Sequence, residues 1–228
     1  MDVPANARAH AEAIHEAKAH VVVFPELSLT GYELDAEPVS PADGALGPIV
    51  DACAAAGALA LAGAPVDDEG RRFIAVLAID GTGARVAYRK SHLGGDELGR
   101  FSAGDGPTVI TVDGWRLGMG ICKDTGVPEH TAGTAELGVD VYVAGLVHAP
   151  AELEEQDARG RHIAAACRSY VAFASFAGPT GGGYEATAGE STIWSPGGSV
   201  VARAGDAPGG IARAELLRTS GTPAISNA

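Results

Sequence analysis

The sequence predicts an α/β protein with mixed β-sheets, and three observations indicate this fold class. Short apolar runs rich in β-branched residues alternate with longer alanine-rich segments that are typical of helices. Turn signals such as Asp80-Gly81-Thr82-Gly83 separate neighbouring runs at hairpin spacing, so antiparallel pairs are expected among the strands. The chain has 228 residues and 46% hydrophobic content, which is enough to bury one core, and we expect a single domain over residues 1–228.

The elements follow from the pattern along the chain. An alanine-rich helix over 5–19 places Ala9, Ala13 and Ile14 on one face. The next strand, over 21–24, ends at Pro25, because proline cannot donate to a ladder. Further helices are expected near residues 47–57, 128–137 and 154–168, and further strands near 59–64, 73–79, 84–89, 108–112, 115–121, 139–144, 170–175, 190–195 and 198–203.

Composition excludes several classes of partner. A net charge of −13 argues against nucleic acid and anionic membranes as partners. The sequence shows neither an 18-residue apolar run nor a signal segment, so we expect a soluble protein. Three cysteines without paired spacing suit the reducing cytoplasm, and Cys53 and Cys167 are expected to be helical packing residues. His10, His15 and His20 spread around a helix, which does not favour a metal site, and no cofactor is expected.

The strongest functional signal is a reactive residue at each of three predicted strand ends. Cys122 follows an apolar run directly; a free cysteine is by default a small buried hydrophobe, but chemistry in α/β sheets collects at carboxyl ends of strands. Glu26 follows a wholly apolar strand, which indicates a structural ion pair or a base with a raised pKa. Lys90 shares a strand face with Val86 and Tyr88, as a site residue or a snorkelling edge lysine would.

These strand ends lie within longer motifs that occur in order along most of the chain, from about residue 6 to about residue 216. The intervals are 64 residues from Glu26 to Lys90 and 32 from Lys90 to Cys122. The motifs are Phe24–Leu27 with Thr30-Gly31-Tyr32, Tyr88–Leu93 with Asp96-Glu97, Gly114–Gly118 with Ile121-Cys122, Asp124 and Pro128-Glu129, and Gly189–Ile193 with Ser195–Gly198. In this combination they resemble the nitrilase superfamily of carbon–nitrogen hydrolases.

The resemblance implies a four-layer α-β-β-α sandwich that pairs into homodimers or higher homo-oligomers. It also implies a mechanism, with Cys122 as the nucleophile and Glu26 as the base that takes the thiol proton. Lys90, with the backbone amide of Lys123 or Asp124, would stabilise the charge that develops on the substrate. Glu97 resembles the second glutamate of the family, which orients the lysine and touches substrate.

Three further residues are predicted to bind substrate. Lys123 replaces an aromatic residue that is common in relatives; it would lower the thiol pKa, meet an anionic substrate group or point to solvent. Asp124, the next residue in the turn, is assigned to the same site. His148 follows the strand near residues 139–147 and would reach the site by topology, whereas His92 is expected to be structural.

The chain also departs from the family pattern. The Glu-Asn pair common near Cys167 and the asparagine common near Ser175 are absent, and Glu129 lacks the arginine that usually follows it. Relatives begin with a strand before their first helix, whereas Met1–Asn6 looks like the loop after that strand. We therefore expect one sheet to lack an inner strand and to leave neighbouring backbone unpaired. A start assigned too late, or a truncated inactive homologue, would explain this.

The leading hypothesis is an amidase-type enzyme that hydrolyses a non-peptide C–N bond in a small molecule and releases ammonia or an amine. N-carbamoyl hydrolase and nitrilase are the alternatives within the family, with carbamoyl compounds and nitriles as substrates. A non-catalytic homologue that binds a metabolite is the alternative from another class. An unrelated Cys-His hydrolase would need a histidine base, and the sequence places none beside Cys122.

Overall fold

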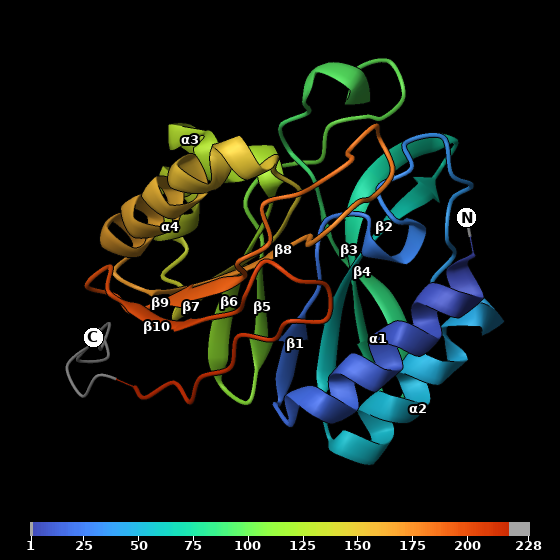
Figure 1. Cartoon of the computed structure of the whole chain (residues 1–228), viewed down its shortest axis with the longest axis horizontal. Coiled ribbons are helices and arrows are strands. Elements are labelled where there is room, and N and C mark those ends of the chain that lie inside the picture. The colour runs from blue at the N-terminus through green and yellow to red at the C-terminus, as the bar shows by residue number, and fades with distance from the viewer. Residues whose placement is uncertain (1, 219–228) are drawn as a thin grey trace, which may run out of the picture.

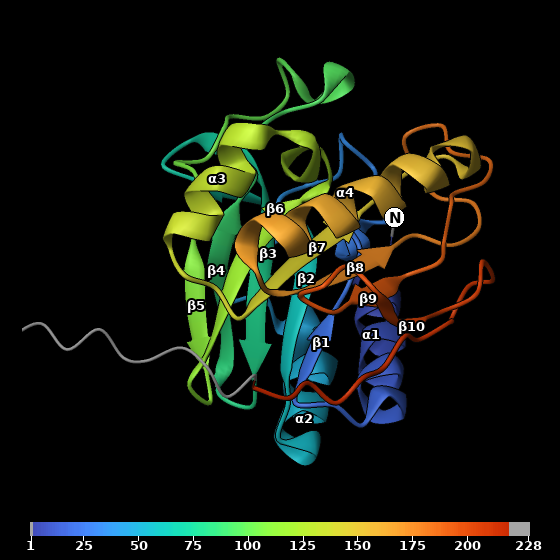
Figure 2. The same ribbon diagram turned by 90° about the vertical axis from the view of Figure 1, so that its left-hand side faces the viewer.

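The computed structural model describes residues 2–218 as four stacked layers: two helices, two β-sheets and two more helices (Figure 1). In Figure 2 the molecule is turned so that the second helical layer faces the viewer, and the same order is seen in depth. The first sheet and its helices comprise α1 (Val3–Ala17), α2 (Gly47–Ala56), β1 (Val21–Val23), β2 (Leu59–Asp68), β3 (Arg71–Asp80) and β4 (Gly83–Arg89). The second sheet and its helices comprise β5 (Val109–Val112), β6 (Trp115–Ile121), α3 (Pro128–Glu136), β7 (Val141–Leu146), α4 (Leu153–Cys167), β8 (Tyr170–Ser175), β9 (Thr192–Trp194) and β10 (Val200–Arg203). The predicted sandwich is confirmed.

Both sheets are mixed, as the hairpin signals predicted. The first has the order β1-β2-β3-β4, with β1 parallel to β2 and the rest antiparallel. The second has the order β10-β9-β8-β7-β6-β5, with a parallel centre formed by β6, β7 and β8. Parallel neighbours end at the same edge of the sheet. The residues that follow β6 and β7 therefore emerge together.

Alternation along β2 shows how the layers pack. Ala60 and Ala62 face the helices, and these small side chains let α1 and α2 lie close to the sheet. Leu59 and Leu61 point the other way, into the core between the two sheets. A third apolar cluster, centred on Trp194, joins the second sheet to α4. The inter-sheet core sets the distance between residues carried by different sheets.

The predicted elements are all present, but some boundaries differ. The first helix begins at Val3 instead of residue 5, so residues 3–6 of the segment predicted as a loop form its first turn, and Met1 lies outside the described residues. Pro4 is accepted there because first-turn N–H groups have no helical partner, and the Asp2 side chain caps the helix by accepting from Ala5 N at 3.0 Å. None of the helices within residues 2–218 is long and apolar enough to span a membrane.

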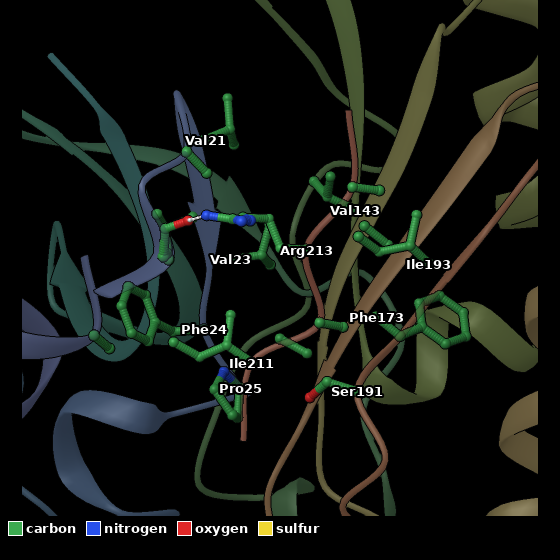
Figure 3. Close-up of a pocket in the computed structure, with 18 of the residues that line it drawn as sticks. Val21, Val23, Phe24, Pro25, Val143, Phe173, Ser191, Ile193, Ile211 and Arg213 are labelled. Carbon is green, nitrogen blue, oxygen red and sulfur yellow. Dashed lines mark hydrogen bonds between the residues drawn. The ribbon is translucent and has the colours of Figure 1, made fainter. Parts of the chain in front are cut away.

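The first sheet ends at β1, and no strand among residues 2–218 pairs with its outer edge. Phe24 N donates to Leu61 O of β2 at 2.9 Å. Because the backbone groups of successive strand residues point to opposite sides, the N–H and C=O groups of Val21 and Val23 point away from β2. They face a groove of about 1170 Å³ (Figure 3). Its walls include Val143 of β7 and other apolar side chains of the second sheet. This agrees with the unpaired backbone expected from the sequence.

Candidate active site

Cys122 follows β6 directly and opens a 3-10 turn, η4 (Cys122–Gly126), which presents the thiol at the end of the strand. Its φ of 35° is left-handed, a conformation that costs a non-glycine residue about 1–3 kcal/mol. Hydrogen bonds on both sides hold the turn: Asp124 accepts from Ile121 N at 3.0 Å, and Thr125 Oγ1 donates to Cys122 O at 2.6 Å. The nucleophile predicted from sequence thus sits on a strained, tightly held backbone.

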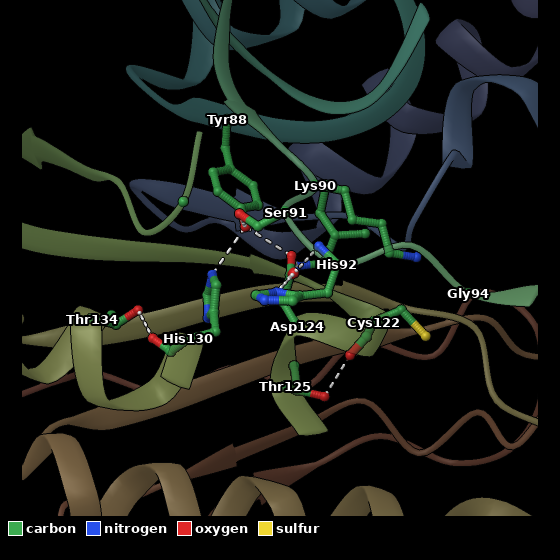
Figure 4. A network of polar contacts seen from close by, with 12 residues as sticks. Tyr88, Lys90, Ser91, His92, Gly94, Cys122, Asp124, Thr125, His130 and Thr134 are labelled. Carbon is green, nitrogen blue, oxygen red and sulfur yellow. Dashed lines mark hydrogen bonds and ion pairs between the residues drawn. The ribbon is translucent and has the colours of Figure 1, made fainter. Parts of the chain in front are cut away.

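Asp124 lies beneath this turn and is completely buried (Figure 4). Besides Ile121 N, its carboxylate accepts from Tyr88 Oη at 2.8 Å and from both the backbone N and the ring Nδ1 of His92, each at 2.9 Å. The Tyr88 hydroxyl also contacts His130 Nε2 at 2.9 Å. The carboxylate of Asp124 thus anchors the η4 turn that carries Cys122, here called the nucleophile turn, and the expected contact of the Asp124 backbone amide with substrate stays a prediction. His92 has the structural position predicted for it.

Glu26 is held in the inter-sheet space by two glycines, one from each sheet. A Cβ on Gly63 of β2 would lie 2.3 Å from Leu27 N, and a Cβ on Gly145 of β7 would lie 2.7 Å from Glu26 N. Any other residue at either position would place its Cβ against the backbone around Glu26, so both positions require glycine. The turn after the base also needs Leu27 at a φ of 51°. Sequence reasoning did not single out these glycines, because nothing local distinguishes them from the other 30 in the chain.

Lys90 follows β4 and joins two carboxylates in the buried interior. Its Nζ donates to Glu26 Oε1 and to Glu97 Oε1, both at 2.6 Å. Glu97 comes from a short 3-10 turn, η3 (Gly95–Glu97), and its other oxygen accepts from Gly94 N at 2.6 Å. Tyr32 Oη donates to Glu97 Oε1 at 3.3 Å. The structure therefore brings Glu26, Lys90 and Glu97 together as one ion-pair chain.

The electrostatics link this chain to the thiol. Burial raises the pKa of Glu26 to about 7, although Lys90 opposes the shift. Burial, and then the charge of Glu26, raise the pKa of Cys122 to about 12. For Lys90, burial alone would lower the pKa, but Glu26, Cys122 and Glu97 together raise it well above its ordinary value. The cysteine is thus a thiol at neutral pH, and it needs a base to become a nucleophile.

One oxygen of Glu26, the predicted base, has no partner within residues 2–218. Glu26 Oε2 is buried and has no hydrogen-bond partner among the described residues. The Lys90 ammonium and the Cys122 sulfur lie on the same side of the nucleophile turn (Figure 4). The thiol itself contacts Val147 O at 3.3 Å. An unpaired buried carboxylate oxygen is costly unless another group uses it, and the arrangement suits proton transfer from a thiol.

The two other predicted substrate residues differ in their surroundings. Lys123 is exposed and makes no hydrogen bond or ion pair to residues 2–218. His148 is buried two residues after β7; its Nδ1 contacts Gln156 Oε1 at 3.1 Å and its Nε2 contacts Arg159 Nη1 at 3.4 Å. Within the described range no group of three or more His, Cys, Asp or Glu side chains is arranged to hold a metal ion.

Sequence reasoning missed an aromatic residue beside the site. Tyr184 packs edge-on against Tyr32, with ring centroids 5.6 Å apart. Burial, and next the charge of Cys122, raise its pKa, and both residues pack against the core between the two sheets. Its loop is fixed to the segment that follows β1 by a hydrogen bond from Gly181 N to Gly31 O at 2.8 Å. A loop of this kind has no local pattern that would have indicated the contact.

Comparison with known proteins places these residues in context. Residues 1–224 match the model of the carbon-nitrogen hydrolase family. A Pseudomonas protegens protein described as "Hydrolase in pqqF 5'region" is 34% identical over 218 residues, which cover 90% of this chain and 75% of the relative. An (R)-stereoselective amidase of a Pseudomonas species is 29% identical over 127 residues, 54% of this chain and 46% of that protein.

Solved structures show the same fold. Saccharomyces cerevisiae Nit3, a member of branch 10 of the nitrilase superfamily, superposes with a TM-score of 0.79 at 23% identity, over 90% of this chain and 82% of that one. A mutant of the amidase from Nesterenkonia sp. AN1, in complex with butyramide, superposes with a TM-score of 0.80 at 23% identity, over 91% of this chain and 83% of that one. Another mutant of that amidase carries the acetamide moiety of fluoroacetamide on its active-site cysteine.

Proposed function

Because this chain belongs to the carbon–nitrogen hydrolase family and is a hydrolytic enzyme, we propose that it cleaves the C–N bond of a small non-peptide amide through a thioester on Cys122. The observation that supports the proposal most directly is the buried chain from Glu26 through Lys90 to Glu97, with one oxygen of Glu26 left without a partner. The amidases among the related proteins favour an amide over a nitrile or carbamoyl substrate.

In the first half-reaction Glu26 accepts the proton of the Cys122 thiol, and the sulfur attacks the carbonyl carbon of the amide. Negative charge develops on the carbonyl oxygen, where Lys90 Nζ and a backbone N–H of the η4 turn stabilise it. The C–N bond then breaks, and the leaving nitrogen takes the proton from Glu26. Ammonia or an amine departs, and the acyl group stays on sulfur as a thioester.

In the second half-reaction water replaces the amine. Glu26 takes a proton from the water, whose oxygen attacks the thioester carbon, and the C–S bond breaks. The proton returns from Glu26 to the sulfur, the acid is released, and the thiol is restored. Glu97 acts through Lys90 by holding the ammonium in place, and its proposed contact with substrate is a separate role.

The remaining predicted residues take different parts in this proposal. The Asp124 carboxylate positions the nucleophile turn through its contacts with protein groups, and the Asp124 backbone amide keeps its proposed part as a donor to the substrate. Lys123 is exposed next to Cys122 and is the candidate contact for an anionic group at the outer end of a substrate. His148 is buried among protein partners, so its proposed role toward substrate would require it to exchange one of them.

The test combines thiol reactivity with turnover. Limiting iodoacetamide should alkylate Cys122 faster than Cys53 or Cys167, and the Glu26→Gln variant should slow that reaction. Ammonia release from butyramide, from an N-carbamoyl amino acid and from butyronitrile should be greatest for the amide and absent in Cys122→Ala. Equal alkylation of the three cysteines, with no turnover of any compound, would favour the non-catalytic binding protein instead.

Two expectations from the sequence stay predictions. Light scattering of the purified protein would check the homodimer or higher homo-oligomer. Fractionation of the source cells would check the cytoplasmic location.

A further inference from the structure

An arginine from the second helical layer reaches the back of the nucleophile turn. Arg159, on α4, is partly buried and is fixed at one end by an ion pair with Glu155, one helical turn earlier. Its Nη1 lies 3.5 Å from Thr125 Oγ1 and 3.4 Å from His148 Nε2. The guanidinium therefore bridges a helix, the nucleophile turn and His148, two residues after β7.

Gly126 makes the space that this guanidinium occupies. A Cβ at Gly126 would lie 2.8 Å from Arg159 Cζ and 3.0 Å from its Nε and Nη2, which is closer than real contacts. The backbone of Gly126 belongs to the 3-10 turn and does not have a positive φ, so alanine is conformationally acceptable there. A side chain at this position would therefore make the Arg159 guanidinium move, whereas the backbone conformation of Gly126 sets no such limit.

The polar contacts form a directional chain that ends at the nucleophile. Arg159 donates to Thr125 Oγ1, and the single hydroxyl proton of Thr125 is donated to Cys122 O at 2.6 Å. Each hydrogen bond in such a chain polarises and strengthens the next. The chain ends on the residue whose φ of 35° is strained, and such a conformation persists only where its surroundings hold it.

We propose that Arg159 is a positioning residue for the nucleophile: seated in the notch at Gly126, it orients Thr125 and so holds Cys122 in its strained conformation. The inference rests on the proposed function, because it concerns the same thiol. It adds a support from α4 that no sequence motif indicated. It also gives His148 a defined part: its Nε2 accepts from Arg159 while its Nδ1 faces Gln156 Oε1.

The test compares two single variants with their combination. Arg159→Ala should lower the rate constant for Cys122 alkylation and kcat by about tenfold to a hundredfold, as small displacements of reacting groups do, with KM for butyramide little changed. Gly126→Ala should have a similar effect, because its methyl group displaces the guanidinium. In the Arg159→Ala background the same Gly126→Ala change should cost nothing further, because the space is then empty.

Controls separate positioning from unfolding. Cys53 is buried in the core, so its alkylation must stay slow in every variant; fast reaction there would mark unfolding. Thr125→Ser keeps the hydroxyl and should retain most activity, whereas Thr125→Val should resemble Arg159→Ala. Arg161→Ala removes an exposed arginine two positions along the same helix and should match the wild type.

The outcomes distinguish this inference from the proposed function. If Gly126→Ala is equally harmful with and without Arg159, or if Arg159→Ala leaves Cys122 alkylation unchanged, the inference is wrong. A wild-type protein that turns over no amide, yet shows the predicted coupling in alkylation, would contradict the proposed substrate and leave the positioning role intact.

Discussion

Replacing Glu26 by glutamine should stabilise the protein at alkaline pH while it abolishes turnover. The side chain is 1% exposed, and burial raises its pKa from an ordinary value of 4.5 to about 7. The folded state thus binds a proton at this carboxyl more tightly than the unfolded chain does. Glutamine has the shape of the neutral acid, its oxygen still accepts from Lys90, and it cannot ionise.

The magnitude follows from the two pKa values. Their difference is 7 − 4.5, about 2.5, and each pKa unit is worth about 1.4 kcal/mol, so ionising Glu26 costs the folded state about 3 kcal/mol. Because the folded pKa is the higher one, this cost is absent below pH 4.5, grows as the pH rises, and is complete above about pH 7. Glu26→Gln should therefore gain about 3 kcal/mol of unfolding free energy at pH 8 and little at pH 5.

Urea denaturation of both proteins at pH 5, 6, 7 and 8, with butyramide turnover at each pH, would measure the effect. Glu154→Gln, which removes an exposed glutamate from α4, controls for the loss of one negative charge and should leave both stability and turnover near the wild type. In the wild type, turnover should fall about tenfold for each pH unit below 7, because only ionised Glu26 accepts the thiol proton. This reasoning would be refuted if Glu26→Gln had a lower unfolding free energy than the wild type at pH 8, or if its unfolding free energy differed from the wild type by the same amount at pH 5 and pH 8.

Three other predictions concern the supports of the site. Asp124→Asn should lower the unfolding free energy by about 2–3 kcal/mol and slow Cys122 alkylation. The reason is that the asparagine NH2 group would face N–H and O–H donors that now bond to a carboxylate oxygen. Unchanged values in urea denaturation and alkylation would contradict the anchoring role. Gly145→Ala should abolish turnover, since its methyl group meets the backbone before the catalytic base, and soluble protein with normal butyramide kinetics would disprove that packing. In hydrogen exchange, the Val21 and Val23 amides should exchange faster than amides at the centre of β3, and equal protection would show that the outer edge of β1 is covered.

The strand ends and their order could be predicted from the sequence because both depend on local pattern. Apolar runs that stop at a reactive residue predicted where Glu26, Lys90 and Cys122 emerge, and the structure places all three at strand ends. Strand boundaries shifted by up to four residues, as at the end of β2, since hydrogen bonding to neighbours, and not composition, decides where a ladder stops. The helix start was wrong because Pro4 was interpreted as loop, although a first turn accepts proline.

Contacts between segments that are distant in the sequence could not be predicted from local pattern. Gly63 and Gly145 lie 82 residues apart, and only the stacking of the two sheets shows that both make room for the segment around Glu26. Asp124 was assigned to substrate because its backbone amide comes just after Cys122, and that assignment stays a prediction. The anchoring role of its carboxylate was missed, because a 3-10 turn sends neighbouring side chains in different directions. Its side chain points into the protein, toward Tyr88 and His92, which no local pattern connects with it.

The site is divided between the two sheets, and this division explains why its supports are so extensive. Glu26 and Lys90 follow strands of the first sheet, whereas Cys122 follows a strand of the second. Proton transfer needs donor and acceptor within hydrogen-bond reach, so the separation of the sheets must be fixed to a fraction of an ångström. Side chains such as Leu61 and Met119 fill the space between the sheets and set that separation. The core is thus part of the catalytic geometry, which is why a buried ion pair, two close glycine contacts and an anchored turn all meet at this junction.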